Sequence, residues 1–477
     1  FAGGAPSNSD AQTPFVSVFR GSADGPVTPP ESRFGADDSK FGYALAGPGR
    51  VDVDTLADLF IGAPTFIVGT NAIGAVFLYR GNASTSIAAT EAWSSEGGQP
   101  STPMRHGASV TALGDLNGDN RGDVCAGSPD ARTPSTNGGL YHCWRSGSGT
   151  LETTEFIATG GSAPNEYYGT KVAGVGDLDG DGRPDFVATG PGGHFMGGAA
   201  TGVAHLYRGT SINNLGFTAS IEGTGVGTQF GSGLSAAGDV DGDGYSDFVI
   251  GSTNAGAGSD GTADLYLGRP TTPYYALSTW TPQVVVTNGS AIFGGAIASG
   301  DVNADGFSDV MVGAPFHFLG AGSLSLFLGG PAGLPDVPTL VIRGTIPTVQ
   351  RLGTAVATAD VNGDGSQDVI VSSGEVTSGD PGEVLVYYGA PVRGPVLDAG
   401  PSRTAQVLEI LSLTGITLTP IGTDKRMSCT VDWGDGSAIE TVNPCTEVAL
   451  GLPSHGFSAG GEYVVRVRAE RLGYGTT

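Results

Sequence analysis

One acidic segment recurs along this chain of 477 residues at an almost constant interval. Five copies share the pattern Asp-x-Asp/Asn-x-Asp with a further Asp at the ninth position, and a degenerate sixth copy ends at Asp58. The ninth-position aspartates lie 65, 62, 62, 62 and 59 residues apart, at Asp58, Asp123, Asp185, Asp247, Asp309 and Asp368. A fixed period of this length indicates a repeat architecture in which every unit is one supersecondary element.

Each unit contains the parts of a four-stranded antiparallel sheet. An aromatic-glycine or similar pair, such as Phe230-Gly231 or Leu352-Gly353, precedes the acidic loop, and short apolar runs such as 309–313 and 75–79 follow it. A fourth, more polar run such as 339–343 completes the unit. With 82 Gly, 29 Pro and only 14% charged residues, the composition excludes a helical protein. The pattern therefore predicts an all-β fold of short strands joined by turns.

A four-stranded sheet repeated about an axis forms a β-propeller, and the number of repeats predicts seven blades over residues 1–395. Copies of the third strand occur seven times, from 15–20 to 382–388. Residues 1–6 match the end of a second strand, so we expect the chain to begin inside a blade. The first strand and acidic loop of that blade would lie upstream or be supplied by another segment. A six-bladed ring with an unpaired N-terminal hairpin is the alternative.

The acidic loops have the spacing of a calcium site. In one copy, oxygen-bearing side chains stand at positions 1, 3, 5 and 9, as Asp239, Asp241, Asp243 and Asp247, with Gly244 at position 6. Ca²⁺ prefers six to eight oxygen ligands, and a seventh-position backbone carbonyl would add one. An EF-hand is excluded, because position 12 is apolar in all five copies and lies in the next predicted strand.

Simple turn formation is the alternative for one isolated copy, but five copies in register, each with a ninth-position carboxylate, favour about five calcium ions. The predicted metal residues, with the seventh position contributing its backbone carbonyl, are Asp115, Asn117, Asp119, Arg121, Asp123, Asp177, Asp179, Asp181, Arg183, Asp185, Asp239, Asp241, Asp243, Tyr245, Asp247, Asp301, Asn303, Asp305, Phe307, Asp309, Asp360, Asn362, Asp364, Ser366 and Asp368.

The degenerate copy departs from this pattern. Counting back from Asp58 places Arg50 at position 1, Asp52 at position 3, Asp54 at position 5 and Leu56 at position 7. Arg50 could serve there as an internal cation. We expect weak calcium binding or none in this loop.

The charge balance argues against two classes of partner. The formal net charge is −25, which disfavours nucleic acid and anionic membrane surfaces. Five divalent ions would change it to −25 + 10 = −15. Direct membrane insertion is not expected, since no apolar run reaches the length of a membrane-spanning helix.

The four cysteines form two sequence-local pairs, Cys125 with Cys143 and Cys429 with Cys445. This arrangement suits one disulfide in each of two domains and an oxidising compartment. Free buried thiols are the alternative.

The aromatic-glycine pair, the acidic loop and the endings Gly62-Ala63-Pro64 and Gly313-Ala314-Pro315 resemble the FG-GAP repeats of integrin α-subunit propellers and their bacterial relatives. This resemblance covers residues 1–395. It implies a seven-bladed propeller with calcium in hairpin loops on one face, in an extracellular or cell-surface protein that binds other macromolecules. Some endings depart from Gly-Ala-Pro, such as Gly251-Ser252-Thr253 and Ser372-Ser373-Gly374, which affects the blade tips rather than the fold.

The period stops after Pro401, and residues 402–477 are expected to form a second domain. Alternating patterns at 431–436 and 461–469 predict strands of an Ig-like β-sandwich. Trp433-Gly434-Asp435-Gly436 with His455-Gly456-Phe457 is similar to PKD domains, which serve as spacers in surface proteins.

We predict a non-enzymatic, calcium-stabilised, secreted or cell-surface propeller in adhesion, recognition or scaffolding. Its partners would be an extracellular protein or glycan, or other subunits of a surface assembly. Three short motifs carry no function in this context: Arg121-Gly122-Asp123, the esterase-like 456–460 and the dinucleotide-like 256–261. A polysaccharide-acting propeller enzyme and a structural subunit of a surface assembly are the alternatives, because catalytic groups can converge from different blades.

Overall fold

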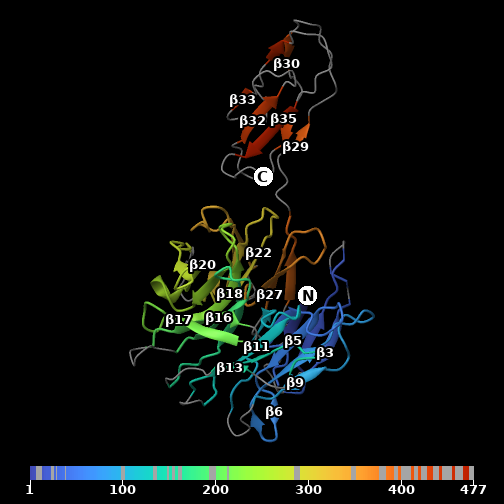
Figure 1. Cartoon of the computed structure of the whole chain (residues 1–477), viewed down its shortest axis with the longest axis vertical. Coiled ribbons are helices and arrows are strands. Elements are labelled where there is room, and N and C mark those ends of the chain that lie inside the picture. The colour runs from blue at the N-terminus through green and yellow to red at the C-terminus, as the bar shows by residue number, and fades with distance from the viewer. Residues whose placement is uncertain are drawn as a thin grey trace. The chain divides into compact units, whose positions relative to one another are not determined.

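A computed structural model gives the fold of this chain (Figure 1). It describes residues 1–390 apart from 7–12, 23–25, 28, 38, 98–102, 133–136, 148–149, 153–155, 159–163, 193–199, 212–213, 284–290, 345–350 and 375–382. Beyond 390 it describes seven short strands. Contacts divide the chain into two compact units, Phe1–Ala390 and Pro391–Thr477.

Apart from one two-stranded hairpin, the described strands of the first unit form seven antiparallel sheets, numbered here as blades 1 to 7 in chain order. Blades 2 to 6 have four strands each, and blades 1 and 7 have three within the described residues. The strands are β1 (Ala2–Ala5), β2 (Phe15–Val18) and β3 (Glu31–Phe34) in blade 1; β4 (Ala44–Gly49), β5 (Asp58–Ala63), β8 (Ala75–Tyr79) and β9 (Trp93–Ser95) in blade 2; β10 (Ser109–Gly114), β11 (Asp123–Ser128), β12 (Leu140–Trp144) and β13 (Phe156–Ala158) in blade 3; β14 (Lys171–Gly176), β15 (Asp185–Gly190), β16 (Val203–Ser211) and β17 (Asn214–Glu222) in blade 4; β18 (Phe230–Gly238), β19 (Asp247–Ser252), β20 (Thr262–Gly268) and β21 (Tyr275–Leu277) in blade 5; β22 (Ala296–Gly300), β23 (Asp309–Ala314), β24 (Ser323–Phe327) and β25 (Leu340–Arg343) in blade 6; and β26 (Val356–Ala359), β27 (Asp368–Ser373) and β28 (Glu383–Tyr387) in blade 7. A small hairpin of β6 (Ile67–Val68) and β7 (Asn71–Ala72) is inserted in blade 2.

The hydrophobic core lies between neighbouring blades. Six clusters of buried residues each join one blade to the next, and the second strands of blades 2 to 6 are buried along their whole length. The aromatic of the aromatic-glycine pair supplies part of this core: Phe230 packs among residues of blades 4 and 5, and Phe293 among residues of blades 5 and 6. Each blade therefore needs its neighbours to bury its apolar faces.

The ring closes between the last and first blades. Gly268 of blade 5 packs so closely on blade 4 that an added side chain would meet the carbonyl oxygen of Leu178. Gly21 of blade 1 packs on the carbonyl oxygen of Val361 of blade 7 in the same way, so blades 7 and 1 are neighbours too. Gly3 also lies against the Val384 side chain, and Figure 1 shows the N-terminal end beside the orange strands of blade 7. The seven-bladed prediction is thus confirmed, and the first hairpin belongs to a blade rather than standing unpaired.

Strand β1 takes the place that the second strand has in the other blades, as the sequence predicted. It pairs with β2, the first copy of the third strand. The five four-stranded blades follow the predicted order of strands along the chain.

Within its described residues, the second unit contains three small antiparallel sheets. They are β29 (Val396–Asp398) with β31 (Thr417–Thr419), β30 (Ile410–Ser412) with β34 (Ser454–Gly456), and β32 (Met427–Asp432) between β33 (Glu440–Val442) and β35 (Arg466–Arg471). The residues Trp433-Gly434-Asp435-Gly436 and Phe457 lie outside the described part. A PKD-like sandwich over 402–477 stays a prediction.

Candidate metal sites

Each acidic loop lies between the first and second strands of its blade. We name the loops after their blades: loop 2 (50–58), loop 3 (115–123), loop 4 (177–185), loop 5 (239–247), loop 6 (301–309) and loop 7 (360–368). In every loop the ninth-position aspartate is the first residue of the second strand. This aspartate is fully buried in loops 3 to 7, and Asp58 of loop 2 is 4% exposed.

The ninth-position carboxylate holds the loop to the rest of its blade. In loop 5, Asp247 Oδ2 accepts a hydrogen bond from the N–H of Val240, and Oδ1 accepts one from the N–H of Gly268 at the end of β20, both at 2.9 Å. The same pair of bonds occurs in all six loops at 2.7–3.0 Å. A carboxylate at position 9 is therefore structural as well as a possible ligand, since each oxygen keeps a lone pair. Its presence alone does not indicate a metal, contrary to the sequence argument.

The first-position aspartate shapes the turn. In loop 5, Asp239 Oδ1 accepts the N–H groups of Gly242 and Asp243, and Oδ2 accepts that of Gly244. Gly242 and Gly244 have φ of 77° and 91°, so both positions 4 and 6 need a left-handed backbone. The sequence analysis identified position 6 only.

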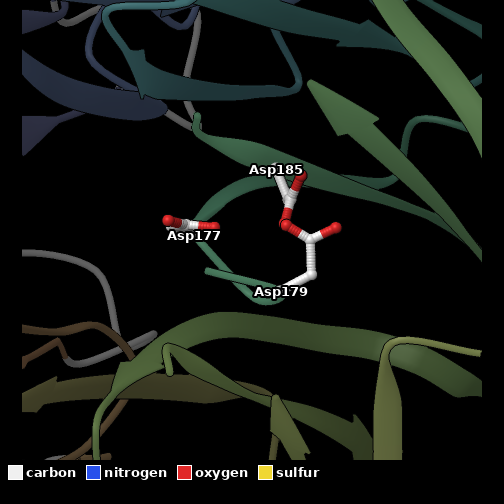
Figure 2. A group of neighbouring side chains, drawn as sticks. All are labelled: Asp177, Asp179 and Asp185. Atoms are coloured by element: carbon white, nitrogen blue, oxygen red, sulfur yellow. The ribbon is translucent and has the colours of Figure 1, made fainter. Parts of the chain in front are cut away.

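Loops 4 and 5 bring three carboxylates together. One oxygen from each of Asp177, Asp179 and Asp185 lies within 4.8 Å of the others, and Asp239, Asp241 and Asp247 form the equivalent group. Figure 2 shows the three carboxylates of loop 4 gathered around the turn between β14 and β15. In two of the five predicted sites, the carboxylates of positions 1, 3 and 9 therefore lie close to one another.

Loops 3, 6 and 7 carry Asn at position 3 instead of Asp. Its amide nitrogen donates to the fifth-position carboxylate, for example Asn303 Nδ2 to Asp305 Oδ2 at 2.9 Å. The amide oxygen accepts the N–H of the same aspartate, for example in Asn362 and Asp364. These loops keep the backbone turn of loops 4 and 5 with one negative charge fewer.

Burial makes the carboxylates costly to ionise without a cation. It raises the pKa of Asp185, Asp247 and Asp309 to about 7, and that of Asp123 to about 6. Repulsion from the other aspartates of each loop raises these pKa values further, while the two backbone hydrogen bonds lower them. A divalent cation among these oxygens would remove that cost, so the donor set fits Ca²⁺.

Loop 2 differs in the way it balances its charge. The guanidinium of Arg50 donates to the carbonyl oxygen of Asn120 in loop 3 at 2.9 Å, so it does not fill loop 2 as the sequence analysis suggested. Arg80, at the end of β8, instead pairs with the buried Asp52, with Nε to Oδ2 at 3.0 Å. Val53 and Thr55 replace the glycines of positions 4 and 6, and neither has a positive φ.

The sequence analysis missed a set of polar residues at the end of the third strand. Arg80 in blade 2, Ser146 in blade 3 and Arg208 in blade 4 all contact loop aspartates. Each of the three stands at, or directly before, the residue whose backbone N–H donates to the ninth-position aspartate. This shared position in the repeat could have identified them from the sequence. Ser146 Oγ lies 3.2 Å from both carboxylate oxygens of Asp119 and from Asp123 Oδ1.

Two of the three discounted motifs and one of the two cysteine pairs lie in the described part of the chain, whereas residues 457–460 of the esterase-like segment lie outside it. Asp123 of Arg121-Gly122-Asp123 is buried with both oxygens bonded to the backbone, so this tripeptide does not present its carboxylate. Residues 257–259 form a short 3₁₀ turn rather than opening a longer helix. Cys125 and Cys143 form a disulfide between β11 and β12, whereas Cys445 lies outside the described residues. Among the helices that the structure describes, none is long and apolar enough to cross a membrane.

Comparison with known families agrees with the repeat. A model of the FG-GAP-like repeat matches residues 115–188 and 177–250, and a model of the FG-GAP repeat matches residues 293–327 and 352–387. The matched ranges begin at the acidic loops of blades 3 and 4, at Phe293-Gly294 of blade 6 and at the equivalent Leu352-Gly353 of blade 7.

Curated proteins similar to this chain are integrin α-subunits. Integrin alpha-5 of Xenopus laevis is 29% identical over 294 residues, which is 59% of this chain and 25% of that protein. Integrin alpha-IIb of Mus musculus is 31% identical over 238 residues, covering 47% of this chain and 21% of that protein. Integrin alpha-4 of Xenopus laevis is 33% identical over 152 residues, which is 30% of this chain and 14% of that protein. The chain thus spans a quarter or less of the length of these relatives.

Proposed function

We propose, from the premise that this chain contains a seven-bladed FG-GAP β-propeller related to those of integrin α-subunits, that it is a calcium-stabilised extracellular or cell-surface protein acting in adhesion, recognition or scaffolding. The role is non-enzymatic. The observation that carries the calcium part is the convergence of three carboxylates in each of loops 4 and 5. The family relation carries the adhesion part.

Calcium would be held by the side chains at positions 1, 3, 5 and 9 of loops 3 to 7, with the backbone carbonyl at position 7. The ion supplies positive charge to carboxylates that burial and mutual repulsion disfavour. Because each loop joins the first and second strands and its ninth residue is bonded to the end of the third, a bound ion would fix three strands of a blade together. Five such ions would stabilise the ring rather than take part in chemistry.

The proposed location rests on the cysteines and the relatives. The disulfide between Cys125 and Cys143 suits an oxidising compartment. The similar proteins are α-subunits of integrins. The partner would be an extracellular protein or glycan, or other copies or subunits of a surface assembly. A PKD-like module at 402–477 would act as a spacer.

Thermal unfolding tests the calcium part. We expect saturating calcium to raise the midpoint of chelator-treated protein well above its metal-free value, because a ligand that binds only the folded state stabilises it by about 2.7 kcal/mol at 100 times its dissociation constant. Asp243→Asn in loop 5 should reduce this increase, and the matched fifth-position variant Asp54→Asn in loop 2 should leave it unchanged. Equal midpoints with and without calcium would contradict the proposal.

Binding assays test the recognition part. Arrays of extracellular proteins and of glycans, probed in calcium and in chelator, should give a partner whose binding is lost in chelator. Shortening of a glycan during the incubation would instead favour the enzymatic alternative.

A further inference from the structure

Loops 4 and 5 offer the same side-chain oxygens but not the same surroundings. Both have Asp at positions 1, 3, 5 and 9, and both gather three carboxylates within 4.8 Å. They differ at the residue before the glycine that donates to the ninth-position aspartate. This residue is Arg208 in blade 4 and Leu267 in blade 5.

The guanidinium of Arg208 lies against the oxygens that a cation in loop 4 would need. Its NH2 group pairs with Asp179 Oδ2 and lies 3.2 Å from Asp181 Oδ2, the carboxylates of positions 3 and 5. The side chain of Asp179 is only 2% exposed and that of Arg208 only 20%, so water screens this pair weakly. In loop 5 the equivalent side chain is an uncharged leucine that packs against the core between blades 5 and 6.

Arg208 is held in this place from the neighbouring blade. Its guanidinium carbon lies 4.0 Å from the ring centre of Tyr274, in the connection between β20 and β21 of blade 5. Its Nε is buried without a hydrogen-bond partner, so the pairing with the loop does not satisfy the whole group. The cation–π contact and the partial burial of the side chain keep the positive charge at the loop.

We propose that Arg208 lowers the affinity of loop 4 for calcium, so that this loop fills at higher calcium concentration than loop 5. This inference rests on the proposed calcium binding and adds a difference between its sites. A fixed positive charge repels an incoming divalent cation and occupies two of its ligands. Loop 4 would then respond to changes in calcium over a range in which loop 5 is already full.

A second arginine in loop 4 provides a comparison. Arg183, at position 7, lies 3.6 Å from Asp181 Oδ2, and its side chain is 40% exposed. Loop 5 has Tyr245 at this position. Because Arg183 is more exposed and touches only one of the carboxylates, its effect on calcium affinity should be smaller than that of Arg208.

The test counts and ranks calcium sites in the whole chain. Chelator-treated protein is titrated with calcium chloride by calorimetry, and the bound ions are counted by native mass spectrometry. Arg208→Leu, which copies blade 5, should tighten one site by at least about tenfold, the size of the repulsion between a divalent and a monovalent charge a few ångströms apart. Arg208→Gln should do the same without adding an apolar group, and Arg208→Lys should stay close to the unmodified protein.

Three further variants locate the effect. Asp179→Asn added to Arg208→Leu should abolish the gain, which assigns it to loop 4. Arg183→Tyr should give a smaller gain. Arg132→Leu should give none, because Arg132 is exposed and follows the end of β11 that lies opposite loop 3. The far-ultraviolet circular dichroism of each variant reports that it folds.

The outcomes separate the two ideas. Calcium binding with affinities that Arg208→Leu and Arg208→Gln leave unchanged overturns the inference and leaves the proposed function standing. Calcium binding by no variant, the unmodified protein included, overturns both. An equal gain in Arg132→Leu would show a general effect of net charge and would also overturn the inference.

Discussion

Asp247 Oδ1 accepts the N–H of Gly268 at 2.9 Å, which joins the acidic loop of blade 5 to the end of its third strand, 21 residues further along the chain. The other oxygen of Asp247 holds the N–H of Val240 inside the loop. The equivalent aspartates of the other five loops make the same two bonds. The loop is therefore shaped by hydrogen bonds to its backbone before any ion is considered.

Asp247→Asn should destabilise the metal-free protein. An asparagine keeps one acceptor oxygen and turns an NH₂ group towards a backbone donor, which leaves a buried N–H unsatisfied at a cost of about 1–3 kcal/mol. Asp241→Asn is the matched control, because asparagine already occupies this position in loops 3, 6 and 7. In urea unfolding with chelator we expect a large loss for Asp247→Asn and a small one for Asp241→Asn. Equal losses would contradict the structural role of position 9.

The stabilisation by calcium should grow as the pH rises. Burial raises the pKa of Asp185, Asp247 and Asp309 to about 7, above the value of about 3.9 in an unfolded chain. Folding without metal thus favours the protonated carboxyls, and this contribution to stability is present below pH 4 and is lost as the pH rises through 7. Calcium needs the ionised carboxylates. The increase in melting temperature on adding calcium should therefore be larger at pH 8 than at pH 5, and the opposite order would exclude these aspartates as ligands.

His106 should make the junction of blades 2 and 3 sensitive to acid. It replaces the phenylalanine found in blades 2, 5 and 6, and its Nδ1 lies 2.8 Å from Ser128 Oγ. Burial, followed by the nearby His142, holds the pKa of His106 well below 6.5. The stability gained from the neutral ring is present above pH 6.5 and is lost as the pH falls through the lower value in the folded protein.

His106→Phe should accordingly reduce the loss of stability between pH 7.5 and pH 5. Urea unfolding at pH 7.5 and at pH 5 measures the change in the free energy of unfolding between them. The variant also leaves Ser128 without the His106 partner, but that loss is the same at both pH values and cancels in the difference. A difference as large as that of the unmodified protein would show that His106 does not titrate on unfolding. His205, whose pKa burial lowers to about 4, remains in both proteins and contributes to the acid dependence that both share.

Removal of the disulfide in blade 3 should weaken the propeller. Cys125 and Cys143 stand opposite each other in β11 and β12, and both are fully buried in the core shared with blade 4. Replacing both by alanine removes a cross-link over 18 residues, worth about 3 kcal/mol. Differential scanning calorimetry should show a lower melting temperature for the propeller, while alanines at Cys429 and Cys445 should leave that transition in place. An unchanged melting temperature for the first variant would contradict the prediction.

The sequence predicted the fold because its period and its patterns agree at every level. Seven copies of the third strand predicted seven blades, and the acidic loops predicted where the first strand turns into the second. The two roles of Asp247 were not predictable, because its partner Gly268 is distant in sequence and carries no side chain to mark it. The pairing of Arg80 with Asp52 was missed because the two residues are also distant in sequence, and the nearer Arg50 was chosen instead.

The difference between loops 4 and 5 could be seen only in three dimensions. Their acidic residues are identical, so the sequence assigned them the same site. The third strand of blade 4 ends beside loop 4 and brings Arg208 to its carboxylates, while blade 5 places Leu267 there. Composition of a loop predicts its ligands, but the neighbouring strands decide which charges surround them.

Anomalous X-ray scattering from crystals grown with calcium tests the central claim most directly. We predict a peak in each of loops 3 to 7, among the side chains at positions 1, 3 and 5. We predict none in loop 2, where Arg50 replaces the first-position aspartate and Arg80 pairs with Asp52. Loops 3 to 7 without peaks at saturating calcium would contradict the account.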